Sequence, residues 1–576
     1  MRSIRLFLIP FSFLILFFLP VEAAVKISKP LKKAHEATCS VLTYDADGQL
    51  VGTGQGFFVG ERGELLAPYS LFVGARTAVT TDAAGTSRQV LKVKGANELY
   101  DVIRLSVATD KKQKTLTADS VVLTVGQKLY LIPVSTAGKK DTGDWLTVTN
   151  REDISDGHSY YTLTGPSATA SLAGRPLLTE EGQLAAVLQP SKEGDTLFYA
   201  LDARFGAGLT IKALTLNESS YRNLSFPKSL PEDVEQAQVY LFVAGNQNDT
   251  PFYPDIVETF IEQFPDNADG YIRRAALLVN KGDTACLAQA EADQAKALEL
   301  AENKDDIHYQ ISRQIIGAVQ ADSTFHYKDW SFERAAAETE QAIALNPLAV
   351  YWQQLGDIRF ALKDVEGALD AYLAICQMPD ATAENYFNAA VICEQLPDSY
   401  ERAVALMDSA VVKASPAGAT SDDGLDYQSA PFVLERALMK ARHEKYRPAV
   451  ADFNLYEKLA GTSVNDRFYY LREQAEANAR MYQQALDDID LAISINPLAA
   501  YLLEKASLNI RVNRIDEARP VLETLIVHYP NDVDCNRLLG YCYAVKGDKQ
   551  RARPLLERAA SLGDTTAANL LERYCK

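Results

Sequence analysis

The sequence predicts a protein of two parts, an all-β part followed by an all-α part. From about Cys39 to Ile211, short segments rich in Val, Leu, Tyr and Thr alternate with Gly, Asp and Asn, which is typical of a β-sandwich or barrel. After Pro227, Ala, Leu, Glu and Gln dominate, and a pattern of about 34 residues recurs, which is typical of stacked helix–turn–helix units. We therefore assign a β-barrel domain to residues 34–215, a linker to residues 216–231 and an α-solenoid of about eight repeats to residues 232–576.

Length and charge narrow the possible functions. The chain of 576 residues is too long for one hydrophobic core, and its 47% hydrophobic and 23% charged content is ordinary for a globular protein. The formal net charge of −18 repels phosphate backbones, so we expect no nucleic-acid partner. The same acidity favours solubility and basic partners.

Residues 1–24 form a predicted signal peptide. Arg2 and Arg5 precede the apolar run from Leu6 to Leu19, and small residues suited to cleavage follow at Ala23 and Ala24. The alternative is an uncleaved membrane anchor, but the run is shorter than the ~20 residues that a spanning helix needs. We expect an exported mature protein with no stable membrane span.

The cysteines predict neither a disulfide framework nor a metal site. They are few, odd in number and without a CxxC pair or a zinc-finger histidine spacing. A bridge between Cys376 and Cys393 is one possibility, but small buried apolar residues are the favoured interpretation. We predict no metal and no cofactor. The seven are Cys39, Cys286, Cys376, Cys393, Cys535, Cys542 and Cys575.

The β part contains several short strand candidates separated by turns, which is the spacing of a sandwich or barrel. The clearest candidates are Ser40–Tyr44, Gly56–Val59, Val102–Val107, Lys128–Val134 and Gln183–Leu188.

The α part repeats four anchors in a constant order. A small residue in a first helix is followed twelve residues later by Ala, then by apolar residues four and three positions further on. The Ala anchors at 449, 485, 518 and 552 are 36, 33 and 34 residues apart. This register resembles a tetratricopeptide (TPR) array, and the resemblance implies a concave face that binds protein or peptide partners. The clearest copy is Leu539, Gly540, Tyr543, Ala552, Leu556 and Ala559.

An insertion interrupts this register between Ala403 and Ala449. The stretch Pro416–Gly424 is rich in small and acidic residues, and we interpret it as an exposed loop. Calcium binding is the alternative, although the acidic residues lack the EF-hand spacing.

Three segments of the β part resemble trypsin-fold serine proteases, most closely the HtrA-like branch. Gly54–Ala75 resembles the strand pair that ends at the catalytic His, whose position is taken by Ser70. Tyr100–Val107 resembles the strand that carries the catalytic Asp, which is retained as Asp101. Ser171–Leu178 resembles the nucleophile loop, and here the three aligned positions differ. Ala173 replaces the serine, Ser171 the oxyanion-hole glycine and Arg175 a second glycine.

These replacements remove the chemistry of acyl transfer. A hydroxyl nucleophile needs a neighbouring imidazole that takes its proton, and Ala173 offers no nucleophile while Ser70 is no general base near neutrality. Ser70 and Ser171 are candidates for a relocated nucleophile. The only histidines of this part are His35, near the mature N-terminus, and His158, on an expected hairpin loop. We predict that no residue is catalytic.

The sequence thus predicts an exported scaffold in which an inactive trypsin-like domain precedes a partner-binding TPR array. Partners would bind the TPR groove and, as a further possibility, the former substrate cleft. The alternatives are an active serine endopeptidase with a non-standard nucleophile, a holdase-like envelope chaperone and, for the fold, an unrelated small β-barrel. The resemblance to HtrA-like proteins and the scarcity of cysteines favour the bacterial periplasm over secretion.

Overall fold

A computed structural model describes residues 28–118, 121–132, 143–166, 172–191, 194–246, 252–322, 324–415 and 424–575. The chain divides into two compact units, residues 1–278 and 279–576. The predicted signal peptide, Ser171 and most of the Pro416–Gly424 stretch lie outside the described residues.

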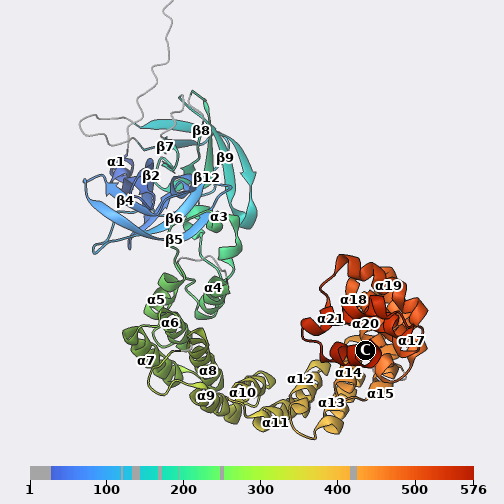
Figure 1. Cartoon of the computed structure of the whole chain (residues 1–576). Helices are drawn as coiled ribbons and strands as arrows, with labels where there is room; N and C mark the ends of the chain where they lie inside the picture. The colour runs from blue at the N-terminus through green and yellow to red at the C-terminus, as the bar shows by residue number, and fades with distance from the viewer. Residues whose placement is uncertain are drawn as a thin grey trace, which may run out of the picture. The chain divides into compact units, whose positions relative to one another are not determined.

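The first unit begins with two closed, antiparallel six-stranded barrels, which is the trypsin-like double-barrel fold (Figure 1). The first barrel has the strand order β1-β2-β3-β6-β5-β4 and the second the order β10-β11-β12-β9-β8-β7. The predicted barrel is therefore confirmed, and the strand candidates of the sequence fall on β1, β2, β6, β7 and β11. The strands of the first barrel are β1 (Thr38–Tyr44), β2 (Leu50–Gly60), β3 (Glu64–Ala67), β4 (Thr77–Asp82), β5 (Ser87–Asn97) and β6 (Val102–Val107). Those of the second are β7 (Lys128–Leu131), β8 (Asp144–Asp153), β9 (Ser159–Thr164), β10 (Pro176–Leu178), β11 (Leu184–Leu188) and β12 (Leu197–Asp202).

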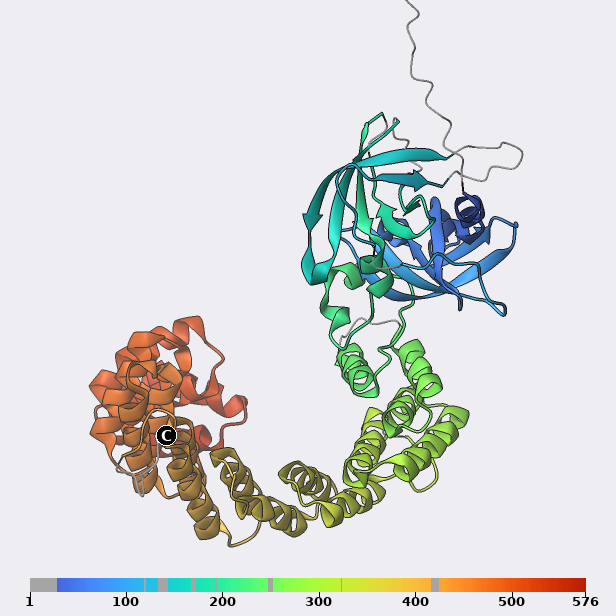
Figure 2. The same cartoon turned by 180° about the vertical axis from the view of Figure 1, so that it is seen from behind.

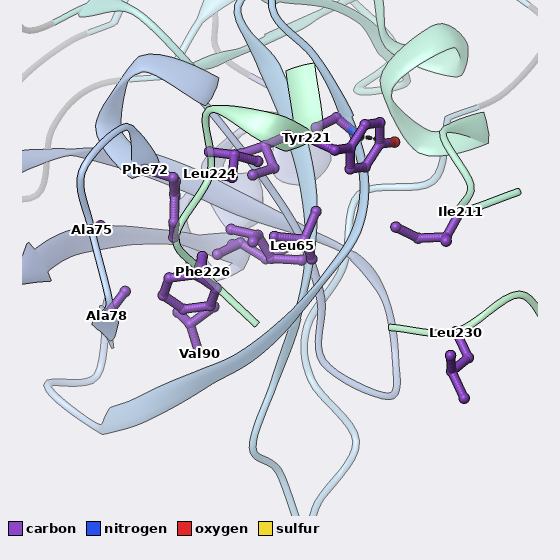
Figure 3. Close-up of a cluster of buried hydrophobic side chains, with 14 of the residues drawn as sticks. Leu65, Phe72, Ala75, Ala78, Val90, Ile211, Tyr221, Leu224, Phe226 and Leu230 are labelled. Atoms are coloured by element: carbon purple, nitrogen blue, oxygen red, sulfur yellow. Dashed lines mark hydrogen bonds between the residues drawn. The ribbon is translucent and has the colours of Figure 1, made fainter. Parts of the chain in front are cut away.

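Residues 216–231, where the sequence suggests a linker, pack on the first barrel. The N–H of Val93 in β5 donates to the carbonyl of Pro227, and the N–H of Ser229 donates back to the carbonyl of Val93, both at 2.8 Å. The ring of Phe226 is 1% exposed and meets Phe72 edge to face, with centroids 5.2 Å apart (Figure 3). This stretch, which we name the strap, is thus part of the barrel's structure.

The core of the first barrel continues through the strap into the first helices. Tyr240 of α4 (Val234–Asn246) and Phe260 of α5 (Tyr253–Gln263) belong to the same buried cluster as Phe226 and the barrel residue Leu65. Lys92 of β5 also donates to the hydroxyl of Thr259 at 2.8 Å. The barrel and these helices therefore share one hydrophobic core.

The second unit is a series of helices packed in neighbouring pairs (Figure 2). Small residues permit the close packing of each pair. A Cβ on Gly356 would lie 2.8 Å from Tyr372, and one on Gly540 would lie 2.7 Å from Leu556. The predicted helical repeat architecture is confirmed, and the small anchors have the packing role that the sequence pattern suggested.

The helices after α5 are α6 (Ala268–Lys281), α7 (Thr284–Leu300), α8 (Lys304–Ala321), α9 (Phe332–Leu345), α10 (Ala349–Ala361), α11 (Val365–Cys376), α12 (Ala383–Glu394), α13 (Tyr400–Ala414), α14 (Ala430–Arg442), α15 (Tyr446–Ala460), α16 (Asp466–Asn478), α17 (Tyr482–Ile495), α18 (Ala499–Arg511), α19 (Ile515–His528), α20 (Val533–Val545), α21 (Lys549–Ser561) and α22 (Thr565–Tyr574). Over the ranges described, no helix is long and apolar enough to cross a membrane.

Two stretches of the second unit repeat the same contacts. In each, one Asp at the start of a helix accepts hydrogen bonds from an Asn amide and a Tyr hydroxyl of a later segment. The acceptor is Asp305 of α8 in the first stretch and Asp466 of α16 in the second. This match places α8, α9 and α10 in register with α16, α17 and α18. The donors are Asn346 and Tyr351 in the first stretch, and Asn496 and Tyr501 in the second.

All seven cysteines are free thiols, and every one except the half-buried Cys286 is buried. Cys376 and Cys393 therefore form no bridge, and burial raises the pKa of the Cys376 thiol to about 11. The interpretation of these two as small buried residues is confirmed.

Candidate functional site

The fold brings the three protease-like segments together. Ser70 lies in the 3₁₀ turn Tyr69–Phe72 after β3, Asp101 in the turn between β5 and β6, and Ala173 in the loop before β10. The two barrels touch here through Gly174, whose φ is +78°. A Cβ on Gly174 would lie only 2.5 Å from the ring of Pro68, so the loop backbone presses directly against the turn that carries Ser70.

Ser70 holds the carboxylate of Asp101. Its backbone N–H donates to Oδ1 at 2.6 Å, and its hydroxyl donates to Oδ2 at 3.2 Å. Asp101 adopts a φ of +41°, in the left-handed region that Asp tolerates better than most residues. Burial raises the pKa of Asp101, against the lowering effect of the two hydrogen bonds from Ser70.

This geometry differs chemically from a catalytic triad. In a triad the carboxylate accepts a hydrogen bond from an imidazole, which in turn takes the proton of the nucleophile. Here the carboxylate of Asp101 accepts a hydrogen bond from the hydroxyl of Ser70 instead. The half-buried Ala173 carries only a methyl group. These three positions therefore hold a hydroxyl, a carboxylate and a methyl group, without the imidazole that links carboxylate and nucleophile in a triad.

The two histidines of the first unit lie elsewhere. His35 Nδ1 contacts the carbonyl of Lys32 at 2.7 Å, within its own N-terminal turn. His158 lies in the hairpin between β8 and β9, and its Nδ1 is 3.7 Å from Oδ2 of Asp202. Asp202 is 1% exposed and is bound through both oxygens by Arg204. In the described contacts, His158 therefore lies beside Asp202 and Phe205 and not beside Ser70 or Asp101.

Sequence reasoning missed an aromatic cluster next to Asp101. Tyr100 packs against Phe205 edge to face at 5.3 Å and against Tyr160 at 5.9 Å, and Tyr160 stacks on Tyr199 at 6.3 Å. His158 meets the same Phe205 at 5.6 Å. These residues come from four separate segments, so no local pattern reveals them. The cluster joins the two barrels beside Asp101.

The fold accommodates Arg175, which stands where the protease pattern has a glycine. Arg175 is 8% exposed, and its carbonyl accepts the N–H of Leu188 at 2.9 Å. Its φ is not positive, so a side chain fits where the protease pattern has a glycine. Ser171, the other altered loop position, lies outside the described residues.

A cavity of about 510 Å³ lies between the first barrel and the start of α4. Two of its charged lining residues, Arg104 and Asp233, are engaged in hydrogen bonds. Arg104 donates to Glu64 at 3.0 Å and to the carbonyl of Leu209 at 3.1 Å, and Asp233 caps α4 by accepting the N–H of Gln236 at 2.9 Å. The contacts of Arg104 lie on the barrel side of the cavity, and the contact of Asp233 lies within the start of α4.

A second cavity, of about 460 Å³, lies on the helices of the second unit. We name it the groove cavity, and α8 and α10 contribute most of its walls. The predicted TPR-like surface thus contains a defined hollow, although its residues carry no sequence motif. The lining residues are Tyr309, Arg313, Ile316, Gly317, Gln320, Phe332, Val350, Gln353, Gln354, Asp357, Ile358 and Ala361.

The chain therefore combines two six-stranded barrels with paired helices, and neither a protein-family model nor a curated protein matches it.

Proposed function

We propose that the protein is an exported binding scaffold, in which a trypsin-like domain without catalytic residues is joined to a TPR array that recognises partner proteins. The observation that carries the first half of this proposal is the pair of hydrogen bonds from Ser70 to Asp101. These hydrogen bonds give Asp101 a structural role. They explain why the aspartate is present although the chain has no histidine at position 70 for it to orient. The groove cavity supports the second half, because a hollow lined by helices is a natural seat for a partner segment.

Absence of catalysis is tested on the full-length protein with a fluorophosphonate probe, which forms a covalent bond with activated serines. We expect no labelling. We also expect none after Ala173→Ser, because the new hydroxyl would have no imidazole to take its proton. Labelling of the wild type that disappears in Ser70→Ala or Ser171→Ala would establish an endopeptidase with a relocated nucleophile and overturn the proposal.

Partner binding is tested by placing a photo-crosslinking amino acid in the full-length protein in cells. The exposed Gln353 of α10 lines the groove cavity, whereas the exposed Gln341 of α9 does not and serves as the matched control. The exposed Ser70 reports on the former catalytic position. We expect discrete protein adducts from position 353 and none from position 341.

The other results of the crosslinking experiment would each point to a different mode of binding. Adducts from position 70 alone would move recognition to the barrels. Equal, diffuse adducts from all three positions would contradict a specific groove and would favour the holdase-like alternative, which predicts suppression of the aggregation of unrelated clients.

A further inference from the structure

We propose that the groove cavity is a specificity subsite that takes one apolar side chain of an extended partner segment, with a carboxylate of the same segment facing Arg313. The inference rests on the proposed function and names the chemistry of the partner. It is carried by three features of the cavity: an unfilled helix glycine, a set of carboxamides and a cation with no carboxylate partner in the described contacts.

Gly317 lines the cavity and leaves open space beside α8. It lies well inside α8, where glycine destabilises a helix relative to alanine. Its φ is not positive, and a Cβ built on it would meet no atom within 4 Å. Neither backbone conformation nor packing therefore requires glycine here, in contrast to Gly356 and Gly540. The missing side chain leaves space that an apolar group of a ligand can fill.

The surroundings of that space suit an apolar side chain. Ile316, Phe332 and Val350 line the cavity, and Val350 is 46% exposed although it is a large aliphatic residue. Covering such a group with a ligand side chain removes apolar surface from water, which is favourable in proportion to the area buried.

The carboxamides indicate an extended segment. Gln320 and Gln353 are exposed at the cavity, and each amide can pair with one peptide N–H and one peptide carbonyl. Gln354 is held in place, because its Nε2 donates to Ser312 at 2.8 Å and to Thr339 at 3.1 Å. A helical ligand satisfies its backbone groups internally, whereas an extended one presents them to these amides.

The charged residues of the groove cavity favour a partner segment that carries a carboxylate. Asp357 of the cavity accepts a hydrogen bond from the hydroxyl of Tyr372 and is thereby engaged. Arg313 is exposed, and the contact described for it is with the ring of Tyr309, 5.8 Å from the centroid. A guanidinium in this position can bind a carboxylate through two parallel hydrogen bonds.

The matching stretch of the array lacks these features. The register set by Asp305 and Asp466 aligns Gly317 with Asn478 and Arg313 with Gln474. Asn478 carries a side chain where α8 has none, and its amide donates to the carbonyl of Gln474 at 2.8 Å. The proposed subsite therefore belongs to α8 and α10 and is not a general property of the array.

The test uses full-length protein and a library of random nine-residue peptides, acetylated and amidated so that only side chains carry charge. We expect selection to enrich an apolar residue with Asp or Glu within two positions. Gly317→Leu should weaken the binding of the enriched peptides at least about tenfold, because the leucine side chain fills the space beside Gly317. Ala337→Leu, at an exposed position of α9 outside the cavity, is the matched control and should leave binding unchanged. Arg313→Gln should remove the acidic preference while keeping the apolar one.

The outcomes separate this inference from the function on which it rests. Melting temperatures at or above that of the wild type would show that Gly317→Leu and Ala337→Leu both fold. Enrichment that survives Gly317→Leu, or that favours basic residues, would overturn the subsite. If crosslinking at position 353 still captured partners, the scaffold function would stand without the subsite. Loss of both crosslinking and peptide enrichment would remove the subsite and the proposed function together.

Discussion

Ser70 donates its backbone N–H to Oδ1 of Asp101 and its hydroxyl to Oδ2, at 2.6 and 3.2 Å. One residue thus satisfies both oxygens of a carboxylate that burial makes costly to ionise. In a protease of this fold the same carboxylate orients an imidazole. Ser70 therefore links its own turn to the turn between β5 and β6 through both oxygens of this carboxylate.

Ser70→Ala should raise the pKa of Asp101 further, because the hydroxyl hydrogen bond stabilises the charged form. With a folded pKa above the unfolded one, the native state binds more protons, so the free energy of unfolding falls as pH rises through the folded pKa. The variant should strengthen this fall and lower stability by about 1 kcal/mol or less near neutrality. Carboxyl ¹³C titration by NMR measures the pKa. An unchanged value would mean that the hydroxyl does not contact the carboxylate.

Glu473→Gln should stabilise the second unit at high pH. Glu473 of α16 is fully buried, its Oε1 has no hydrogen-bond partner, and burial together with nearby Glu504 raises its pKa to about 8. The native state therefore holds a proton that the unfolded chain releases near pH 4.5, and this stability is lost as pH rises through about 8. We expect a gain of roughly 1–3 kcal/mol at pH 9 and almost none at pH 4.5.

Urea unfolding at the two pH values measures this difference. Glu517→Gln, at an exposed site of α19, is the control and should change stability little at either pH. A gain from Glu473→Gln that is equal at both pH values would show that Glu473 is charged in the folded protein throughout.

Two glycines of neighbouring helices should respond oppositely to alanine. Gly317→Ala should stabilise the protein by about 0.5–1 kcal/mol, because the new methyl meets no atom and the unfolded chain loses freedom. Gly356→Ala should destabilise it by about 1–3 kcal/mol, because the methyl would lie 2.8 Å from the ring of Tyr372. Thermal unfolding followed by circular dichroism compares the pair. Changes of the same sign would contradict the described packing.

Phe226→Ala should release the strap from the first barrel. The ring is 1% exposed and packs on Phe72, so its removal should cost about 3–5 kcal/mol. We expect limited proteolysis to cut the variant within residues 216–231 at a protease level that leaves the wild type intact. Leu214→Ala, at a residue that is 58% exposed, is the control. Equal cleavage of wild type and Phe226→Ala would show that the strap is already detached.

Much of the architecture could be predicted from the sequence, because alternation, turn residues and a 34-residue register are local signals. The barrel strands around Ser40–Tyr44 and Val102–Val107, and the small anchors at Gly356 and Gly540, lie where those signals place them. The positions Ser70, Asp101 and Ala173 could also be chosen in advance, since each stands in a short segment with a recognisable pattern.

Only the tertiary structure decided what those positions do. The hydrogen bonds between Ser70 and Asp101 join residues 31 positions apart, and the aromatic cluster at Tyr100 joins four segments. The strap contains Ser, Asn and Pro, which suggest a free linker, yet Phe226 is buried because the barrel offers it an apolar surface. The opening beside Gly317 likewise depends on how α8 and α10 pack. Local sequence determines which elements form, whereas burial, cavities and paired charges depend on contacts between distant segments that no single stretch of sequence contains.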